Sequence, residues 1–167
     1  MLNIAVRSAR DTDVDVVTRI YNQGIADRIA TFETRLRAPD DLLPVVTSGQ
    51  FPCMVATVAS DVVGFASTSA YRERACYAGV AEFSIYIERS WRGQGIGVVL
   101  MDGLCQAAQT HGYWKVLSRV FVENTASRRM LARAGFREVG IYQRHAQLEG
   151  NWRDVVIVEK LLDDPSQ

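Results

Sequence analysis

The region from residue 80 to residue 111 constrains the fold most, because a glycine-rich loop joins a strand pattern to a helix pattern there. Apolar and polar side chains alternate over residues 80–87, which is the period of a strand. Ile96, Leu100 and Leu104 then recur at helical spacing within residues 95–111. The loop between them reads Ser-Trp-Arg-Gly-Gln-Gly-Ile-Gly over residues 90–97. This unit predicts an α/β protein with a backbone loop at the start of a helix.

The loop contains Gly93, Gly95 and Gly97, which leave main-chain N–H groups open beside a helix N-terminus. Successive N–H groups that point at one place bind an anion such as a phosphate. Val98 stands where the dinucleotide pattern GxGxxG requires its third glycine, and the chain contains no GxxxxGK[ST] sequence. Those two nucleotide motifs are therefore excluded, and a tight turn without a ligand is the structural alternative.

Strand and helix patterns alternate along the rest of the chain. A strand over residues 3–7 precedes a helix capped by Asp11, and another helix begins at Pro39. Further strands are expected at residues 53–59, 62–71, 115–122, 136–142 and 154–161, and a last helix at residues 125–134. This order predicts a three-layer α/β fold, with a mixed central sheet of about 6–7 strands flanked by about 4 helices. Residues 1–167 are expected to form a single domain.

Composition excludes several classes of function. Of 167 residues, 48% are hydrophobic, and Lys plus Arg equal Asp plus Glu at 19 each. This balance provides no overall basic field that would attract nucleic acid or an anionic membrane. The longest uncharged stretch, residues 42–60, contains Pro44, Gly49 and Pro52 and therefore no continuous spanning helix. Since the N-terminus also lacks the apolar region of a secretory signal, we expect a cytoplasmic protein without nucleic-acid or membrane partners.

The cysteines indicate neither a disulfide framework nor a metal site. Cys53, Cys76 and Cys105 are odd in number and widely spaced, and the chain has two histidines. A zinc site requires a closer set of ligands than these residues offer. We therefore expect reduced thiols and no bound metal.

Several motifs resemble those of a known family. Arg92-x-x-Gly95-x-Gly97 after a strand is similar to the acetyl-CoA pyrophosphate loop of the GNAT superfamily of N-acetyltransferases, and NTASRRMLARAGF from residue 124 resembles its second cofactor-side motif. YNQGIADRIATFET, AEFSIYI and GNWRDVVIVEKLL resemble runs of the phosphinothricin and arsinothricin N-acetyltransferase family. The resemblance extends over residues 3–161. It implies an N-acetyltransferase of the acyltransferase class that uses acetyl-CoA as its cosubstrate.

The resemblance also implies a cofactor site. The backbone groups of Ile85, Tyr86 and Ile87 would meet the pantetheine arm, which pairs with a strand edge as an added strand would. Asn124 would contact the same arm, although an Asn before a helix is also an ordinary N-cap. The pyrophosphate would be held through main-chain amides by Arg92, Gly93, Gln94, Gly95, Ile96 and Gly97.

Acetyl transfer to an amine requires a proton acceptor, because amino groups are largely protonated at neutral pH. Glu82 is the candidate, since it lies between Ala81 and Phe83, where desolvation would raise its pKa and improve it as a general base. The alternative is a strand carboxylate that pairs with a neighbouring Arg. The resemblance adds that the family has a catalytic glutamate at this position.

The sequence does not identify a general acid for the departing thiolate. Superfamily members that use a tyrosine have it seven residues after the asparagine matched by Asn124, and Leu131 stands there. A thiol with an ordinary pKa of about 8.5 is a tolerable leaving group without such an acid. Tyr86 and Tyr142 are the remaining candidates.

Two arginines are candidates for binding an anionic acceptor. Arg72 and Arg74 flank Glu73, and alternation in an extended segment would turn both guanidinium groups to one side. Such a clamp suits a carboxylate or phosphinate, and each charge-assisted contact contributes about 1.5–3 kcal/mol. A solvated charged loop is the alternative. By resemblance, Phe32 and Glu33 also approach the substrate.

We therefore expect acetylation of the α-amino group of a small anionic amino acid or analogue, such as phosphinothricin, arsinothricin, methionine sulfone or methionine sulfoximine, and hence a role in antibiotic or herbicide resistance. The alternatives are a protein or peptide amine as acceptor, and a non-catalytic acyl-CoA sensor. The resemblance also suggests a homodimer with the region of Trp152 near the subunit contact. His111 and His145 lack a carboxylate at triad-like placement and are expected at the surface or in caps.

Overall fold

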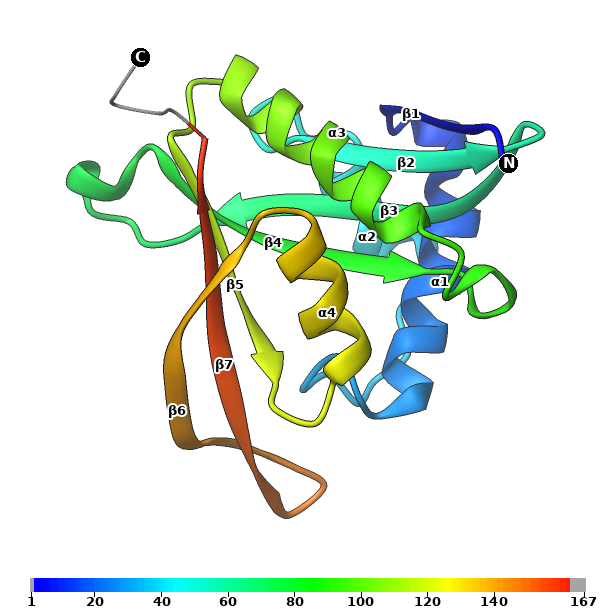
Figure 1. Cartoon of the computed structure of the whole chain (residues 1–167). Helices are drawn as coiled ribbons and strands as arrows, with labels where there is room; N and C mark the ends of the chain where they lie inside the picture. The colour runs from blue at the N-terminus through cyan, green and yellow to red at the C-terminus, as the bar shows by residue number, and fades with distance from the viewer. Residues whose placement is uncertain (1, 163–167) are drawn as a thin grey trace.

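Figure 1 shows the computed structural model, which describes residues 2–162 as a twisted sheet with helices on both faces. The strands are β1 (Ile4–Ser8), β2 (Cys53–Val58), β3 (Asp61–Ala70), β4 (Val80–Ile87), β5 (Lys115–Phe121), β6 (Arg137–Leu148) and β7 (Asn151–Leu161). The helices are α1 (Val14–Asp27), α2 (Pro39–Val46), α3 (Ile96–Thr110) and α4 (Thr125–Arg133). The 7-stranded sheet has the order β1-β2-β3-β4-β5-β7-β6, in which β4 and β5 are parallel and the other neighbours antiparallel. The predicted mixed three-layer fold is confirmed, and the assignment of residues 1–167 to one domain stays a prediction.

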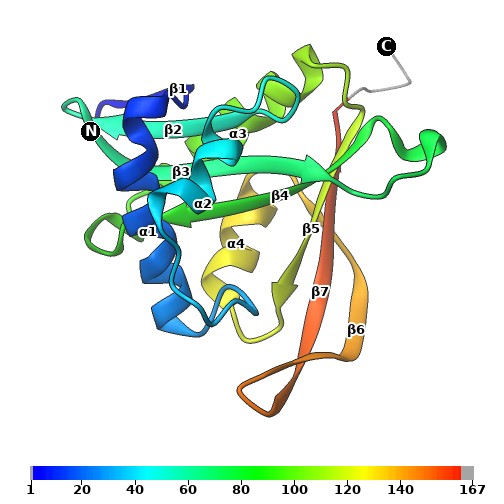
Figure 2. The same cartoon turned by 180° about the vertical axis from the view of Figure 1, so that it is seen from behind.

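Two apolar layers hold the helices against the sheet. Helices α3 and α4 cover one face (Figure 1), and α1 and α2 cover the other (Figure 2). The alternation of β2 separates the layers, because Met54 and Ala56 belong to the cluster under α3 whereas Cys53 and Val55 pack with α1 and α2. A fully buried aliphatic side chain contributes about 1.5–3 kcal/mol to folding, so both layers fix the strands that carry the site. None of the helices within residues 2–162 combines the length and the hydropathy that a membrane crossing needs.

The start of α1 differs from the prediction, because Asp11 does not cap it. Asp11–Asp13 form a single 3₁₀ turn, and α1 begins after it. The buried carboxylate of Asp13 accepts hydrogen bonds from the Arg10 backbone N–H at 2.8 Å and from Arg7 Nη1 and Nη2 at 2.7 and 2.9 Å. Asp13 is the N-cap residue of α1 but makes no side-chain hydrogen bond to the helix; its carboxylate instead ties β1 to the turn that precedes α1.

Asp13→Asn is expected to lower the free energy of unfolding by about 2 kcal/mol at pH 7, because it removes charge-assisted bonds to Arg7. The hydrogen bond from Arg7 is the main cause that lowers the pKa of Asp13. The folded pKa lies below the unfolded value of about 3.9, so this contribution is present above about pH 4 and is lost as pH falls through the folded pKa. Urea unfolding at pH 7 and pH 3 measures the difference, with exposed Asp11→Asn as the control. An equal loss at both pH values would contradict the assignment.

The hairpin of β6 and β7 is longer than predicted, because pairing continues to its turn at Glu149 and Gly150. Residues 143–147, Gln-Arg-His-Ala-Gln, lack the alternation of a strand, so the sequence predicted a connection there. A β-bulge lets the backbone pair through this stretch despite its side chains. Trp152 falls between the two predicted strands, 136–142 and 154–161, but lies in β7, where it is 56% exposed.

Candidate active site

One edge of β4 has no neighbouring strand beyond Glu82. Residues 80–82 pair with residues 115–117 of β5, and the two strands then spread apart beside α4 (Figure 1). The Glu88 N–H donates to the Val63 carbonyl on β3 at 2.8 Å, so strand alternation turns the N–H and C=O groups of Ile85 toward the open edge. These groups can pair with an extended ligand as they would with another strand.

The neighbours of Ile85 have different backbone roles. The Ile87 carbonyl also faces the open edge, but it accepts a hydrogen bond from Arg92 Nε at 3.1 Å. Tyr86 is in register with Phe65, and alternation turns its backbone groups into the ladder with β3. Of the three predicted backbone contacts, Ile85 thus has the open N–H and C=O pair, while Tyr86 offers its side chain.

The glycine loop follows β4 and a single 3₁₀ turn, Arg89–Trp91. Gly93 and Gly95 have φ angles of +77° and +83°, a region that favours glycine, and a Cβ added at either position would meet nothing within 4 Å. A Cβ at Gly97 would lie 2.9 Å from the Met130 side chain, so this glycine lets α3 and α4 approach closely. The first two glycines shape an uncovered backbone at the N-terminus of α3, which is the geometry of an anion site.

An ion-pair cluster ties the loop to the end of α1. Asp27 Oδ2 lies 2.7 Å from Arg92 Nη1, and Asp27 Oδ1 lies 2.6 Å from Arg89 Nη2. Burial pushes the pKa of Asp27 upward, but the hydrogen bonds from Arg92 and Arg89 together hold it below its usual range. Because the Arg92 side chain is already paired with Asp27, the main-chain amides are the groups of the loop that remain for an anion.

A cavity of about 400 Å³ runs along the loop and the open strand edge. All predicted cofactor residues except Gln94 line it: Ile85, Tyr86, Ile87, Arg92, Gly93, Gly95, Ile96, Gly97 and Asn124. Gln94 instead donates from Nε2 to the Ser90 carbonyl at 3.3 Å. Asn124 caps α4 by accepting from the Ser127 N–H at 3.2 Å, so its cap role and its place on the cavity wall coexist. We name this space the loop cavity.

A second cavity of about 550 Å³ adjoins the first and contains Glu82. Both are lined by Ala30, Ile85, Tyr86, Asn124 and Ser127, so they meet where β4 and β5 separate. We name this second space the acceptor cavity. The predicted substrate residues Phe32 and Glu33 line it.

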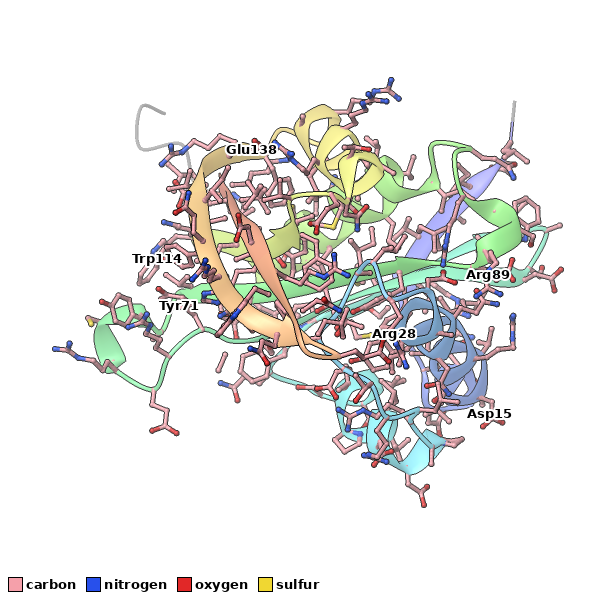
Figure 3. The ribbon with its side chains drawn as sticks, turned by 90° about the horizontal axis from the view of Figure 1, so that it is seen from below. Asp15, Arg28, Tyr71, Arg89, Trp114 and Glu138 are labelled. Atoms are coloured by element: carbon pink, nitrogen blue, oxygen red, sulfur yellow. The ribbon has the colours of Figure 1, made fainter. Side chains whose placement is uncertain are left out.

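The segment after α1 forms one wall of the acceptor cavity. The Phe32 ring packs edge-on against Phe121 of β5, with the ring centroids 4.8 Å apart. Arg28 is labelled in Figure 3, and its Nε lies 3.0 Å from Oε1 of Glu149 in the β6–β7 turn. These contacts hold the segment between α1 and the hairpin and place the Phe32 ring in the wall of the acceptor cavity.

The side chain of Glu82 is paired with an arginine, as the alternative prediction stated. Arg119 Nη2 lies 2.7 Å from Oε1 and 2.8 Å from Oε2 of Glu82. The Glu82 side chain is 24% exposed and that of Arg119 is 42% exposed, so both are open to the acceptor cavity. An ionised carboxylate that also faces a cavity can accept a proton from a ligand held there.

The predicted clamp of Arg72 and Arg74 is not brought to Glu82. Both arginines are exposed in the connection between β3 and β4, and neither lines the two cavities. The Arg72 guanidinium lies over the Tyr71 ring, 5.1 Å from its centroid. Figure 3 shows Tyr71 on the side of the molecule opposite Arg89 and the glycine loop. The connection is not a regular extended strand, because the chain bends at Glu73 and Arg74 and then forms a 3₁₀ turn, Ala75–Tyr77.

Two site residues were missed by the sequence analysis, namely Arg119 and His145. Both line the acceptor cavity. His145 lies in the β6 bulge, where Arg144 has a φ of +47° and its N–H donates to Asp154 Oδ1 at 2.7 Å. The resemblance of the last strand to its family was a signal for this region, but nothing in the sequence indicated the bulge.

A model of the acetyltransferase (GNAT) family matches residues 22–136, which include both walls of the loop cavity. The chain belongs to the GNAT acetyltransferase family. The predicted superfamily and enzyme class are confirmed. GNAT enzymes use acetyl-CoA, so the predicted acetyl donor is confirmed as well.

Relatives of this GNAT chain cover nearly its whole length. A phosphinothricin N-acetyltransferase of Streptomyces coelicolor is 30% identical, over 95% of this chain and 96% of the relative. An L-methionine sulfoximine/L-methionine sulfone acetyltransferase of Pseudomonas aeruginosa is 27% identical, over 97% of this chain and 96% of the relative. An N-acetyltransferase structure from Staphylococcus aureus is 26% identical, with a TM-score of 0.88 over 96% of this chain and 99% of that one. A phosphinothricin acetyltransferase from Sinorhizobium meliloti, solved with AcCoA, is 24% identical and has the same fold, with a TM-score of 0.88 over 96% and 89%.

Neither tyrosine candidate for a general acid is well placed in this GNAT site. Burial raises the pKa of Tyr86, whose ring stacks on Phe65 with centroids 5.5 Å apart. A phenol with a raised pKa is a weaker acid at neutral pH. Tyr142 is exposed on β6 and lines neither cavity, and Leu131 is buried. The thiolate is therefore expected to leave as such and to take its proton from solvent.

The cysteines are expected to be dispensable for acetyl transfer. Burial raises the pKa of Cys53 to about 12 and that of Cys105 to about 11, whereas Cys76 is exposed. Because the thiolate is the reactive form, a disulfide reagent should label Cys76 rapidly in the native protein and the other two only after unfolding. Absorbance of the released reagent measures the labelling. Loss of activity on labelling Cys76 would contradict this prediction.

Proposed function

We propose that this GNAT enzyme transfers the acetyl group of acetyl-CoA to the α-amino group of a small anionic amino acid or analogue. The observation that carries the proposal is that the loop cavity and the acceptor cavity meet at the open edge of β4, with Glu82 on the far side of the junction. The two relatives named for phosphinothricin and for methionine sulfoximine or sulfone support this class of acceptor.

The residues of the loop cavity fit acetyl-CoA. The uncovered backbone at Gly93 and Gly95 would hold the diphosphate through N–H groups at the N-terminus of α3. The N–H and C=O groups of Ile85 would pair with the amide-bearing arm at the strand edge. Acetyl-CoA supplies the acetyl group as a thioester, whose C–S bond breaks as the C–N bond to the amine forms. The chain contributes by holding both partners in one geometry, which lowers the entropic part of the barrier.

Glu82 is the group that would accept the amine proton. Its carboxylate lies in the acceptor cavity, and Arg119 fixes its orientation through contacts to both oxygens. A positioned general base contributes about 10²- to 10⁴-fold to a reaction rate. Glu33 lines the same cavity and also pairs with an arginine, but its side chain is 46% exposed against 24% for Glu82, so water competes more strongly for it. Glu82 is therefore the better candidate of the two carboxylates.

Thiol release from acetyl-CoA with a panel of acceptors tests the proposal. The panel contains phosphinothricin, methionine sulfone, methionine sulfoximine and a peptide with a free N-terminus. We expect turnover of the small amino acids and little turnover of the peptide. The reason is that the segment after α1, which carries Phe32, closes one side of the acceptor cavity. Turnover of the peptide alone would contradict the acceptor class. Binding of acetyl-CoA without turnover of any acceptor would favour the sensor alternative.

We further propose that the chain forms a homodimer through the β6–β7 hairpin. Val139, Ile141 and Tyr142 of β6 and Trp152 of β7 are large apolar side chains exposed on this hairpin. Exposed apolar groups gathered on one element are typical of an interface. Sedimentation of the native chain and of Trp152→Glu, which should be monomeric, measures the assembly. A cytoplasmic location and a role in resistance stay predictions.

A further inference from the structure

The charge environment of the acceptor cavity is unusual for a site that handles an amine, because it contains a guanidinium. Among the described residues that line the cavity, Arg119 is the one Arg or Lys side chain. Its side chain contacts Glu82 through Nη2, and no other hydrogen bond of the Arg119 side chain to residues 2–162 is seen. Its Nε and Nη1 N–H groups are therefore free to bind a ligand in the cavity.

The two charges come from neighbouring strands at the place where those strands separate. Glu82 is in register with Leu117, and Arg119 lies two residues further along β5 on the same face of the sheet. The pair therefore presents an anion and a cation side by side in the acceptor cavity. The other carboxylate that lines the cavity, Glu33, is 2.7 Å from Arg37 and does not compete for Arg119.

We propose that Arg119 binds the α-carboxylate of the acceptor while Glu82 binds and deprotonates its α-amino group. This inference rests on the proposed function and adds the group that recognises an α-amino acid as such. The amino and carboxylate groups of an α-amino acid share one carbon, so they can contact the adjacent Glu82 and Arg119 together. With Nη2 engaged by Glu82, the Nε–H and Nη1–H groups of Arg119 point in different directions, so one of them donates a charge-assisted hydrogen bond to the carboxylate.

Charge balance supports the assignment at each stage of the reaction. Before proton transfer, the ammonium pairs with the Glu82 carboxylate and the carboxylate pairs with Arg119. After the proton moves to Glu82, that side chain is neutral and Arg119 still pairs with the acceptor carboxylate. No charge is left alone in the cavity, where an unpaired charge would be costly. Arg119 lines the cavity and its side chain is 42% exposed, which leaves it accessible to a ligand there.

Arg119→Gln separates the two roles when it is assayed with two acceptors. The first is methionine sulfone, and the second is methylsulfonylpropylamine, the same amine without its carboxylate. We expect the variant to raise KM for methionine sulfone by about 10- to 100-fold, which corresponds to the loss of one charged contact. KM for the amine should change by less than about 3-fold, because it has no carboxylate to lose. Arg119→Lys, which keeps the charge, should lie between the variant and the native enzyme.

Arg35→Gln is the matched control, because Arg35 pairs with Asp41 at 3.3 Å and lines neither cavity. Equal changes for both acceptors in Arg119→Gln would overturn the inference, since Arg119 would then act only through Glu82. Calorimetric binding of methionine sulfone to the native CoA complex distinguishes the two proposals. Binding that depends on Arg119 without turnover supports the carboxylate subsite and contradicts the proposed activity. If the native enzyme neither binds nor acetylates methionine sulfone, the inference is overturned.

Discussion

Glu82→Gln is expected to lower kcat by about 10²- to 10⁴-fold near neutral pH, the contribution of a positioned general base. Glutamine keeps the length of the side chain and one oxygen that can accept from Arg119, but it cannot take the amine proton. The affinity for acetyl-CoA should not change, because Glu82 lines the acceptor cavity and not the loop cavity. Steady-state kinetics and calorimetric titration of acetyl-CoA measure the two effects separately.

The loss of kcat in Glu82→Gln should become smaller as pH rises, because a larger fraction of the acceptor amine is then already unprotonated. Glu138→Gln is the control, since Glu138 also pairs with an arginine, at 2.7 Å from Arg128, but lines neither cavity. An unchanged kcat for Glu82→Gln would contradict its role as base. Loss of acetyl-CoA binding in the same variant would show instead that Glu82 supports the donor site.

Gly95→Val is expected to weaken acetyl-CoA binding by about 10- to 100-fold. The φ of Gly95 is +83°, where a β-branched residue costs about 1–3 kcal/mol. The loop can relieve that strain only by rotating its backbone, which would turn the N–H groups away from a bound diphosphate. Calorimetric titration with CoA and with acetyl-CoA measures the loss.

Gly112→Val is a close match as a control for this substitution. Gly112 follows α3 at its other end, has a φ of +88° and, like Gly95, has nothing within 4 Å of an added Cβ. Both variants should lose stability to a similar degree, but only Gly95→Val should lose affinity for acetyl-CoA. Equal binding by the two variants would contradict the assignment of the loop as the diphosphate site.

The sequence was sufficient to predict those strands and helices whose own residues carry the signal. The alternation of residues 80–87 predicted β4 with the observed bounds, and Pro39 marked the start of α2. The last hairpin was predicted too short, because its pairing depends on a bulge and not on alternating side chains. The cap of α1 was assigned to Asp11 because the sequence could not show that Asp13 would meet Arg7.

Contiguous candidates for the site could be proposed from the sequence, whereas residues that meet across distant strands could not. The glycine loop and Glu82 are local features, and the structure places both on the two adjoining cavities. Arg119 is 37 positions from Glu82 in the chain, and only the parallel register of β4 and β5 brings them together. Arg72 and Arg74 were expected to turn to one side on the assumption of an extended segment, whereas the chain bends there and continues into a 3₁₀ turn.

The central claim is that the backbone of the glycine loop holds acetyl-CoA so that its thioester reaches the junction beside Glu82. A crystal structure of the acetyl-CoA complex tests this most directly. We expect the diphosphate within hydrogen-bond distance of the N–H groups of residues 93–97, the arm along Ile85, and the thioester at the boundary of the two cavities. Acetyl-CoA bound elsewhere, with these N–H groups free of the diphosphate, would contradict the account.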